Sequence, residues 1–162
     1  MSKIKLLILL LISSFFGACT SNPKPDYQFT INYIGGGADG LIYSNYLNSY
    51  LKSLNMYDAL SSYSIDTSIN HKKTLFVTNV NNTSDRELII TIITAKINDN
   101  IHGCTILEFK DDVQQYYVIS SNIYFNSNDK AVENIKRSNS EILTKKFVNY
   151  LYNLKNLNCR DD

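Results

Sequence analysis

A dense run of Ile, Leu and Thr occupies residues 86–98, which read RELIITIITAKIN. β-Branched side chains lose rotamer freedom in a helix and pack well on a pleated surface. Apolar residues fall on both phases of the alternation in this run. This pattern predicts a central strand that is covered on at least one face, with the neighbouring segments as its partners.

Three further segments have the pattern of strands. Residues 27–34 and 63–70 alternate between apolar and polar positions, which predicts strands with one solvated face. The second of them should remain extended until a turn that precedes the central strand. Residues 105–117 form the next predicted strand, and we expect a bend within it at Asp111 and Asp112.

Two segments have apolar residues at three- and four-residue spacings, which predicts amphipathic helices. The first covers residues 41–54, with Asp39 as its N-cap. Its Asn and Ser residues are weak helix formers, so packing on the sheet must stabilise it. The second covers about residues 128–157 and is capped by Asn128 or Asp129. Lys145, Lys146 and Lys155 lie toward its C-terminal half, where the helix dipole favours cations.

The predicted order of elements is therefore β-α-β-β-β-α. This order indicates an α+β two-layer sandwich, with two helices packed on one face of a four-stranded sheet. Residues 118–127 would connect the last strand to the last helix irregularly. A length of 162 residues predicts one domain, which we assign to residues 27–157, followed by a C-terminal tail at 158–162.

The first residues have the pattern of a signal peptide. Lys3 and Lys5 precede an unbroken apolar core at residues 6–12. That core is too short to span a membrane and has the length of a signal-peptide core. We therefore expect residues 1–18 to be a signal peptide.

The residues after this core are Phe16, Gly17, Ala18 and Cys19, and they resemble the lipobox of bacterial lipoproteins. Phe16 stands where such motifs usually have Leu. The resemblance implies that Cys19 is diacylated and becomes the first residue of a polar, lipidated tether at 19–26. Thr20 in place of Asp implies the outer membrane, on its periplasmic face. The alternative is an ordinary signal peptide that contains a Cys.

The net charge of the chain argues against nucleic acid as a partner. Removal of residues 1–18 takes away two of the sixteen basic residues, which leaves fourteen against fifteen acidic residues and a net charge of about −1. A nearly neutral domain has no electrostatic footprint for nucleic acid.

Two cysteines remain after Cys19. Cys104 and Cys159 could form a disulfide in an oxidising periplasm, provided that their Cα atoms come within about 7 Å of each other. The alternative is two unpaired thiols, one buried and one on a frayed C-terminal tail. The sequence leaves both possibilities open.

No catalytic, cofactor or metal site is predicted. His71 and His102 have no metal-ligand spacing, and we interpret both as solvated loop residues. His102 and Cys104 lie two residues apart, but no third group that could orient the pair is visible. Residues 35–40 are rich in Gly but lack the spacing of a phosphate-binding loop. The two adjacent carboxylates of the expected bend should face opposite sides of the strand, so they are unsuited to shared acid–base work.

The predicted order of elements, together with the lipobox, resembles the LptE family of outer-membrane lipoproteins, in the manner of its divergent alphaproteobacterial members. The resemblance covers about residues 27–154. In the middle of the family's fold, an alternating strand and a loop precede a long strand that begins near an Arg, and residues 63–69 and 86–92 match this pattern. The C-terminal part of the family's fold is matched by a linker that contains Tyr at 123–125 and by a final helix with the segment 146–151.

The resemblance implies a role without enzymatic activity. LptE-like proteins plug the LptD β-barrel, assist its assembly, and help to insert lipopolysaccharide into the outer leaflet. The expected partners are therefore an LptD-like barrel and lipopolysaccharide. The family is credited with binding lipopolysaccharide through basic residues, and the scattered candidates in this chain are Lys72, Lys73, Arg86 and Lys96. None of them is assigned as a ligand.

A second function is compatible with the same features. An auxiliary envelope lipoprotein of a lipid-transport system, of the ABC or MCE type, would have a similar size, anchor and α+β composition. A periplasmic enzyme would need a polar cluster that the sequence does not show.

Overall fold

The computed structural model describes residues 25, 27–77, 84–119 and 125–159. The predicted signal peptide, Cys19 and most of the tether lie outside these residues, as do residues 120–124 of the predicted connection 118–127. None of the described helices is long and apolar enough to cross a membrane.

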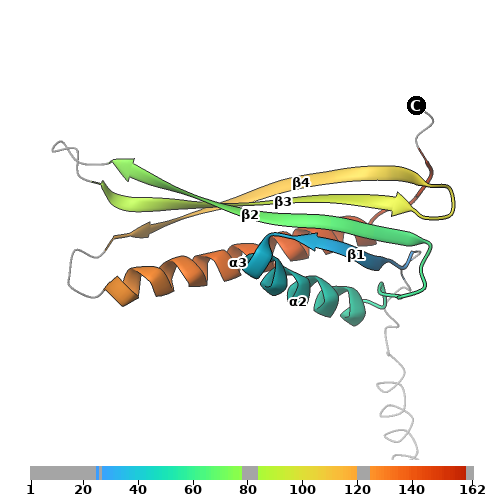
Figure 1. Ribbon diagram of the computed structural model, residues 1–162, viewed down its shortest axis with the longest axis horizontal. Coiled ribbons are helices and arrows are strands. Elements are labelled where there is room, and N and C mark those ends of the chain that lie inside the picture. Colours follow the sequence, from blue (N-terminus) through green and yellow to red (C-terminus); the bar gives the residue numbers. More distant parts are fainter. Residues whose placement is uncertain (1–24, 26, 78–83, 120–124, 160–162) are drawn as a thin grey trace, which may run out of the picture.

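Four strands form one mixed sheet in the order β1-β2-β3-β4, and two helices lie on one of its faces (Figure 1). The elements are β1 (Thr30–Gly35), α2 (Gly37–Ser53), β2 (Tyr63–Val77), β3 (Ser84–Asp99), β4 (Cys104–Val118) and α3 (Phe125–Tyr152). This confirms the predicted α+β sandwich and its β-α-β-β-β-α order.

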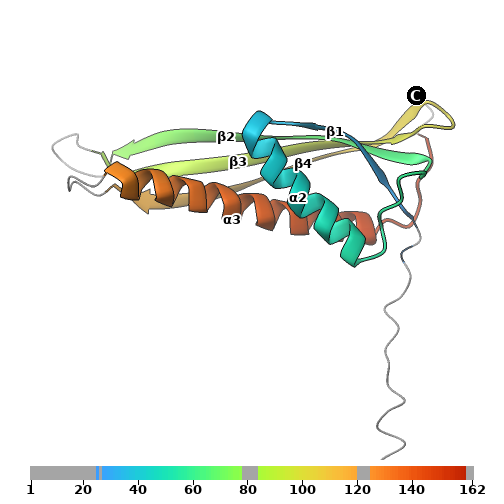
Figure 2. The same cartoon turned by 60° about the horizontal axis from the view of Figure 1, so that its bottom comes forward.

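The connections explain the mixture of strand directions. β1 pairs in parallel with β2, and α2 provides the crossover that a parallel pair needs. β2, β3 and β4 then pair antiparallel along almost their whole length. Figure 2 shows α2 and α3 in contact side by side across the same face of the sheet.

The central strand was predicted correctly, and it is covered by helices on one face. Alternate residues of β3 are buried toward the helix layer: Glu87, Ile89, Thr91, Ile93, Ala95, Ile97 and Asp99. The opposite phase, which includes Ile90 and Ile92, is only partly buried. Apolar residues therefore occupy both phases, although the described helices form a second layer on one face alone.

The core lies between the sheet and the two helices. Fully buried side chains from α2 and α3 pack against the buried phase of the strands: Tyr43, Leu47, Leu51, Leu143, Phe147 and Leu151. Burial of each such side chain contributes roughly 1.5–3 kcal/mol relative to exposure. This packing compensates for the weak intrinsic helix propensity of α2.

Both helices begin before their predicted caps. Gly36, with φ 116°, is the N-cap of α2, and Asp39 lies inside the first turn rather than at the cap. The predicted cap was wrong because the chain leaves β1 through a left-handed residue, a conformation that only Gly adopts at little cost. α3 begins at Phe125 instead of Asn128 or Asp129, and it ends at Tyr152 instead of 157.

The expected bend in β4 is absent. Asp111 and Asp112 pair in continuous register with Ile93 and Ile92 of β3. Asp111 faces the helices, where its Oδ2 lies 2.9 Å from Lys146 Nζ, so the strand can carry this charge without bending. β1 is also shorter than predicted: it begins at Thr30 instead of residue 27.

Candidate interaction surface

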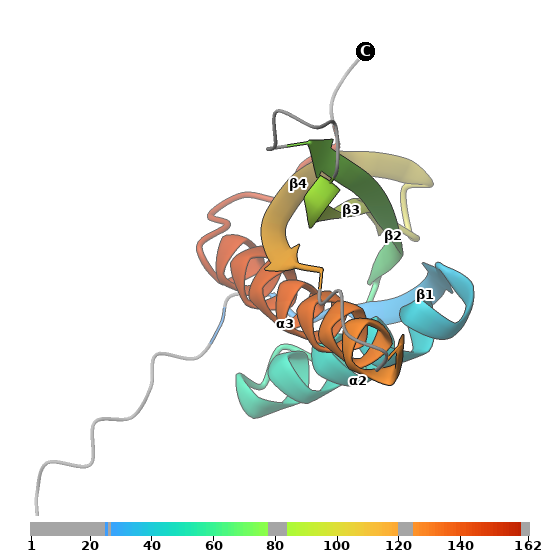
Figure 3. The same ribbon diagram turned by 90° about the vertical axis from the view of Figure 1, so that its left-hand side faces the viewer.

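The face of the sheet opposite the helices carries no second layer of described residues. Figure 3 shows both helices on one side of the twisted sheet and none on the other. We call this side the open face. It contains the strand residues of the phase that alternates with the buried one, contributed by β2, β3 and β4.

One half of the open face, which we call its apolar half, carries a strip of apolar side chains among polar ones such as Lys72 and Gln114. Leu88 pairs with Tyr116 and Ile90 pairs with Gln114 across β3 and β4. The Tyr116 and Val118 side chains are exposed, whereas Leu88 and Ile90 are half-buried by their neighbours. This half could bury further apolar surface against another molecule.

The other half of the open face is polar and is organised by Asp66. Its two carboxylate oxygens accept hydrogen bonds from Asn32 Nδ2 at 2.8 Å and from Asn98 Nδ2 at 2.7 Å. Asn98 Oδ1 in turn accepts a hydrogen bond from Thr105 Oγ1 at 2.9 Å. These four side chains come from four different strands, so a single polar line crosses the whole sheet.

A hollow of about 290 Å³ lies beside this polar line. Its lining residues include Tyr33, Ser68 and Thr94. On its rim, Lys96 Nζ lies 2.6 Å from Glu108 Oε1, and this contact raises the pKa of Lys96. The open hollow has both apolar rings and paired charges, as expected of a surface that meets a partner.

His71 is not a solvated loop residue, contrary to the prediction. It lies on β2 facing the helices, and its side chain is only 4% exposed. Its Nδ1 lies 2.8 Å from Thr91 Oγ1, which also accepts a hydrogen bond from Asn139 at 3.0 Å. Its Nε2 lies 3.8 Å from Asp39 Oδ2, which Lys136 Nζ approaches to 3.3 Å. The histidine therefore joins both helices to the sheet.

The electrostatics of this cluster favour a neutral imidazole. Burial lowers the pKa of His71; Asp39 opposes that shift, and Lys136 adds to it. The spatial arrangement of Asp39, His71 and the Thr91 hydroxyl resembles the Asp-His-Ser order of a catalytic triad. Thr91, however, is fully buried, so its hydroxyl cannot meet a substrate. The arrangement is suited to holding the layers together.

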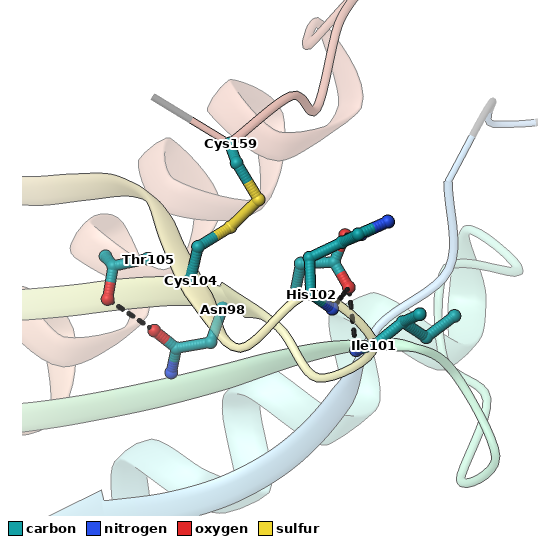
Figure 4. Close-up of a disulfide and its surroundings, with 7 residues drawn as sticks. Asn98, Ile101, His102, Cys104, Thr105 and Cys159 are labelled. Atoms are coloured by element: carbon teal, nitrogen blue, oxygen red, sulfur yellow. Dashed lines mark hydrogen bonds and ion pairs between the residues drawn. A yellow bond between two sulfur atoms is a disulfide. The ribbon is translucent and has the colours of Figure 1, made fainter. Parts of the chain in front are cut away.

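His102 is exposed in the turn between β3 and β4, as predicted. Its ring Nδ1 lies 2.7 Å from Asp99 Oδ2, and its side chain is 69% exposed. The structure joins Cys104 and Cys159 by a disulfide, with their Cα atoms 5.9 Å apart (Figure 4). Cys104 is thus committed to Cys159 and does not form a pair with His102.

The same turn contains the group of described residues that most resembles a metal site. Potential ligand atoms of Asp99, His102 and Cys159 lie within 4.8 Å of one another. The sulfur of Cys159 is bonded to a second sulfur, however, and only a thiolate is a good metal ligand. In the disulfide form this group offers two ligands, which are already hydrogen-bonded to each other.

The four scattered basic residues do not form one cluster. Lys72 lies on the open face opposite Ile90, in its apolar half. Lys73 belongs to the opposite phase, where its Nζ lies 2.7 Å from Glu87 Oε2. Lys96 lies in the polar half beside Glu108. Arg86 is exposed on β3, opposite Val118 of β4.

The sequence alone does not reveal the polar line on the open face. The alternation of residues 63–70 indicates that Asp66 faces solvent, but it does not indicate which residues flank it. That requires the register of β2 with β3 and the bulge in β1 that presents Asn32. The available signal was that Asp66 and Asn98 lie on two strands predicted to be neighbours, where a carboxylate and an amide could form a hydrogen bond.

Comparison with known proteins relates this fold to bacterial lipoproteins. No protein-family model matches the sequence, and no curated protein matches it. The structure is similar to that of rare lipoprotein B from Shewanella oneidensis, with a TM-score of 0.62 at 9% identity, over 76% of this chain and 92% of that one. A minor lipoprotein from Acinetobacter baumannii has a TM-score of 0.60 at 12% identity, over 80% of this chain and 93% of that one.

A third solved structure extends this group. Lipoprotein B from Nitrosomonas europaea has a TM-score of 0.55 at 10% identity, over 76% of this chain and 81% of that one. At such low identities the likeness concerns the fold. The chain therefore has the fold of the rare-lipoprotein-B type, across nearly the full length of these lipoproteins.

Proposed function

We propose that this protein is an outer-membrane lipoprotein that plugs an LptD-like β-barrel, assists its assembly and helps to insert lipopolysaccharide into the outer leaflet. The observation that carries the proposal is the combination of a rare-lipoprotein-B type fold with a lipobox-like Cys19 at the end of an apolar leader. In this proposal the protein acts through binding, without catalysis.

The shape of the domain supports a binding role. The three antiparallel strands are 15 or 16 residues long, and such strands span about 50 Å. The open face extends along this length, with apolar residues at one end and the Asp66 line at the other. A long, two-sided domain of this kind offers a barrel wall many contacts.

Association is tested first by capture of partners. The full chain, tagged at its C-terminus, is extracted from outer membranes in detergent after photo-crosslinking. One variant carries the photoreactive residue in place of Gln114 on the open face. A matched variant carries it in place of Ser138, which is exposed on α3. We expect a large β-barrel protein in roughly equal amount, crosslinked from at least one of these positions.

The same experiment separates the competing functions. Recovery of an ABC-transporter or MCE subunit in place of a barrel would contradict the proposal and support an auxiliary role in lipid transport. If neither position crosslinks to any envelope protein, the result would contradict the proposal that the protein plugs a barrel. Depletion of the protein should in addition reduce lipopolysaccharide at the cell surface.

A further inference from the structure

One end of the domain gathers the segment before β1 and two turns. Phe29 N donates to Met56 O at 2.8 Å, and Asp58 N donates to Phe29 O at 3.0 Å. Asn100 N donates to Ser62 O at 2.8 Å. These bonds join the start of the described domain to the α2–β2 connection and the β3–β4 turn, at the right-hand end in Figure 1. We call this the tether end.

Each of the two turns displays a large apolar side chain. Leu60 is 92% exposed and Ile101 is 75% exposed. Both are built in the same way, because each backbone N–H donates to the carboxylate of an Asp two residues earlier: Leu60 to Asp58 at 2.9 Å and Ile101 to Asp99 at 2.8 Å. Such Asx turns order the backbone at the tip, so the point from which each exposed side chain projects is defined.

The acidic groups of these turns are directed to the backbone. The side chain of Asp99 is only 8% exposed, and its oxygens accept bonds from Ile101, from His102 N and from the His102 ring. The side-chain hydroxyl of Ser64 donates to Asn100 Oδ1 at 2.9 Å and ties this turn to β2. The tips therefore present apolar side chains outward and direct their carboxylates inward.

The surroundings of the tips contain Tyr and Lys. Lys52 Nζ lies 5.0 Å from the centre of the Tyr57 ring, at the C-terminal end of α2. Tyr27 OH donates to the carbonyl of Lys155 at 3.1 Å. Tyr rings and Lys side chains beside exposed aliphatic residues are the composition that favours the headgroup region of a bilayer.

The position of Cys19 places lipid near this end. Cys19 lies eight positions before Tyr27, and a fully extended chain over that distance spans at most about 29 Å. An acyl chain on Cys19 would therefore hold the tether end, and not the far end of the long strands, close to the membrane surface.

We propose that the tether end is a membrane-contacting surface, in which Leu60 and Ile101 insert into the headgroup region of the periplasmic leaflet. This inference rests on the proposed lipidation of Cys19. It deepens the proposed function by giving the domain a fixed orientation, with the long strands directed away from the anchor. In a barrel complex the tether end would remain at the periplasmic rim.

The experiment uses the absence of Trp from this chain. The full lipidated protein is reconstituted into phosphatidylethanolamine–phosphatidylglycerol vesicles with either Leu60→Trp or Ile101→Trp as its only Trp. Leu75→Trp is the matched control, because Leu75 is also exposed but lies near the far end of β2. Emission is compared in vesicles with and without lipids brominated near the headgroup.

We expect blue-shifted emission that is quenched by brominated lipid for positions 60 and 101, and no quenching for position 75. If the protein floats with the vesicles but positions 60 and 101 are quenched no more than position 75, the anchor stands and this inference is wrong. Equal quenching at all three positions would also overturn it, because the domain would then lie flat. A protein that does not float with vesicles lacks the anchor, and both the lipoprotein proposal and this inference fail.

Discussion

Cys104 and Cys159 are 55 residues apart in the sequence, yet their Cα atoms lie 5.9 Å apart. The first begins β4, and the second comes after the end of α3. Between Tyr152 and Cys159, the Lys155 carbonyl accepts a hydrogen bond from Tyr27 OH at the tether end, and Leu157 is buried. The disulfide therefore attaches the C-terminal segment to the edge strand of the sheet.

Removal of this disulfide should destabilise the domain. In the chain-entropy model, a cross-link that closes a loop of this length stabilises the folded state by about 4 kcal/mol. We expect the double variant Cys104→Ser, Cys159→Ser to lose roughly 2–4 kcal/mol, measured as a lower urea midpoint with a steeper slope, because the unbridged unfolded chain exposes more surface. The unsubstituted protein in excess reductant is the control and should match the variant. An unchanged midpoint would mean that the bridge does not constrain the unfolded chain.

The buried His71 should make stability depend on pH in a defined window. Because burial lowers its pKa in the folded state, the unfolded state binds the proton more readily. The contribution to stability is complete above the unfolded pKa of about 6.5 and is lost as the pH falls toward the lower folded value. Urea midpoints should therefore decrease between neutral and mildly acidic pH, before the carboxylates titrate.

The matched control for this pH dependence is His71→Gln, which cannot titrate. It should be less stable at neutral pH by about 1–3 kcal/mol, because it disturbs the buried bond to Thr91. Its midpoint should change less than that of the unsubstituted protein across the same pH window. Parallel pH profiles for the two proteins would assign the effect to other groups.

The sequence was informative wherever burial has a regular period. The alternation in residues 63–70 and the spacing in α3 identify the faces that meet in the core, because both reflect contact with one continuous apolar layer. The prediction for His71 was wrong for the same reason: a polar residue was assigned to solvent. The structure places His71 on the buried phase, where polar contacts with other elements compensate for the cost of burying its ring.

Other features depend on relations that are not local. The disulfide requires the chain after α3 to return to β4, and no spacing within either segment indicates this. The N-cap of α2 depends on the approach of the Ile69 carbonyl to Gly36, which only the assembled sheet determines. The polar line depends on Asp66 lying between Asn32 and Asn98, which is set by strand register and by the bulge in β1.

Gly36 should tolerate a side chain less well than its neighbour Gly37. A Cβ at position 36 would lie 2.6 Å from the Ile69 carbonyl oxygen, and φ is 116°. At Gly37 nothing lies within 4 Å of such a Cβ, and φ is 58°. We expect Gly37→Ala to cost about 1–2 kcal/mol, which is the usual penalty for a left-handed residue, and Gly36→Ala to cost more. Thermal unfolding of both variants tests the order; equal costs would mean that β2 moves aside freely.

The Asp66 line should contribute to stability more than a carboxylate elsewhere on the same face. Asp66→Ala leaves the Asn32 and Asn98 amides without their shared acceptor, although water can reach both at the surface. We therefore expect a loss of about 1–2 kcal/mol, at the lower end of values for bonds to charged groups. Asp112→Ala is the control, because Asp112 is exposed on the open face and accepts a hydrogen bond from Gln114 of its own strand. Its effect should stay within about 0.5 kcal/mol. If urea midpoints of the two variants coincide, Asp66 does not tie the strands together, and the polar half of the open face is held by the backbone ladder alone.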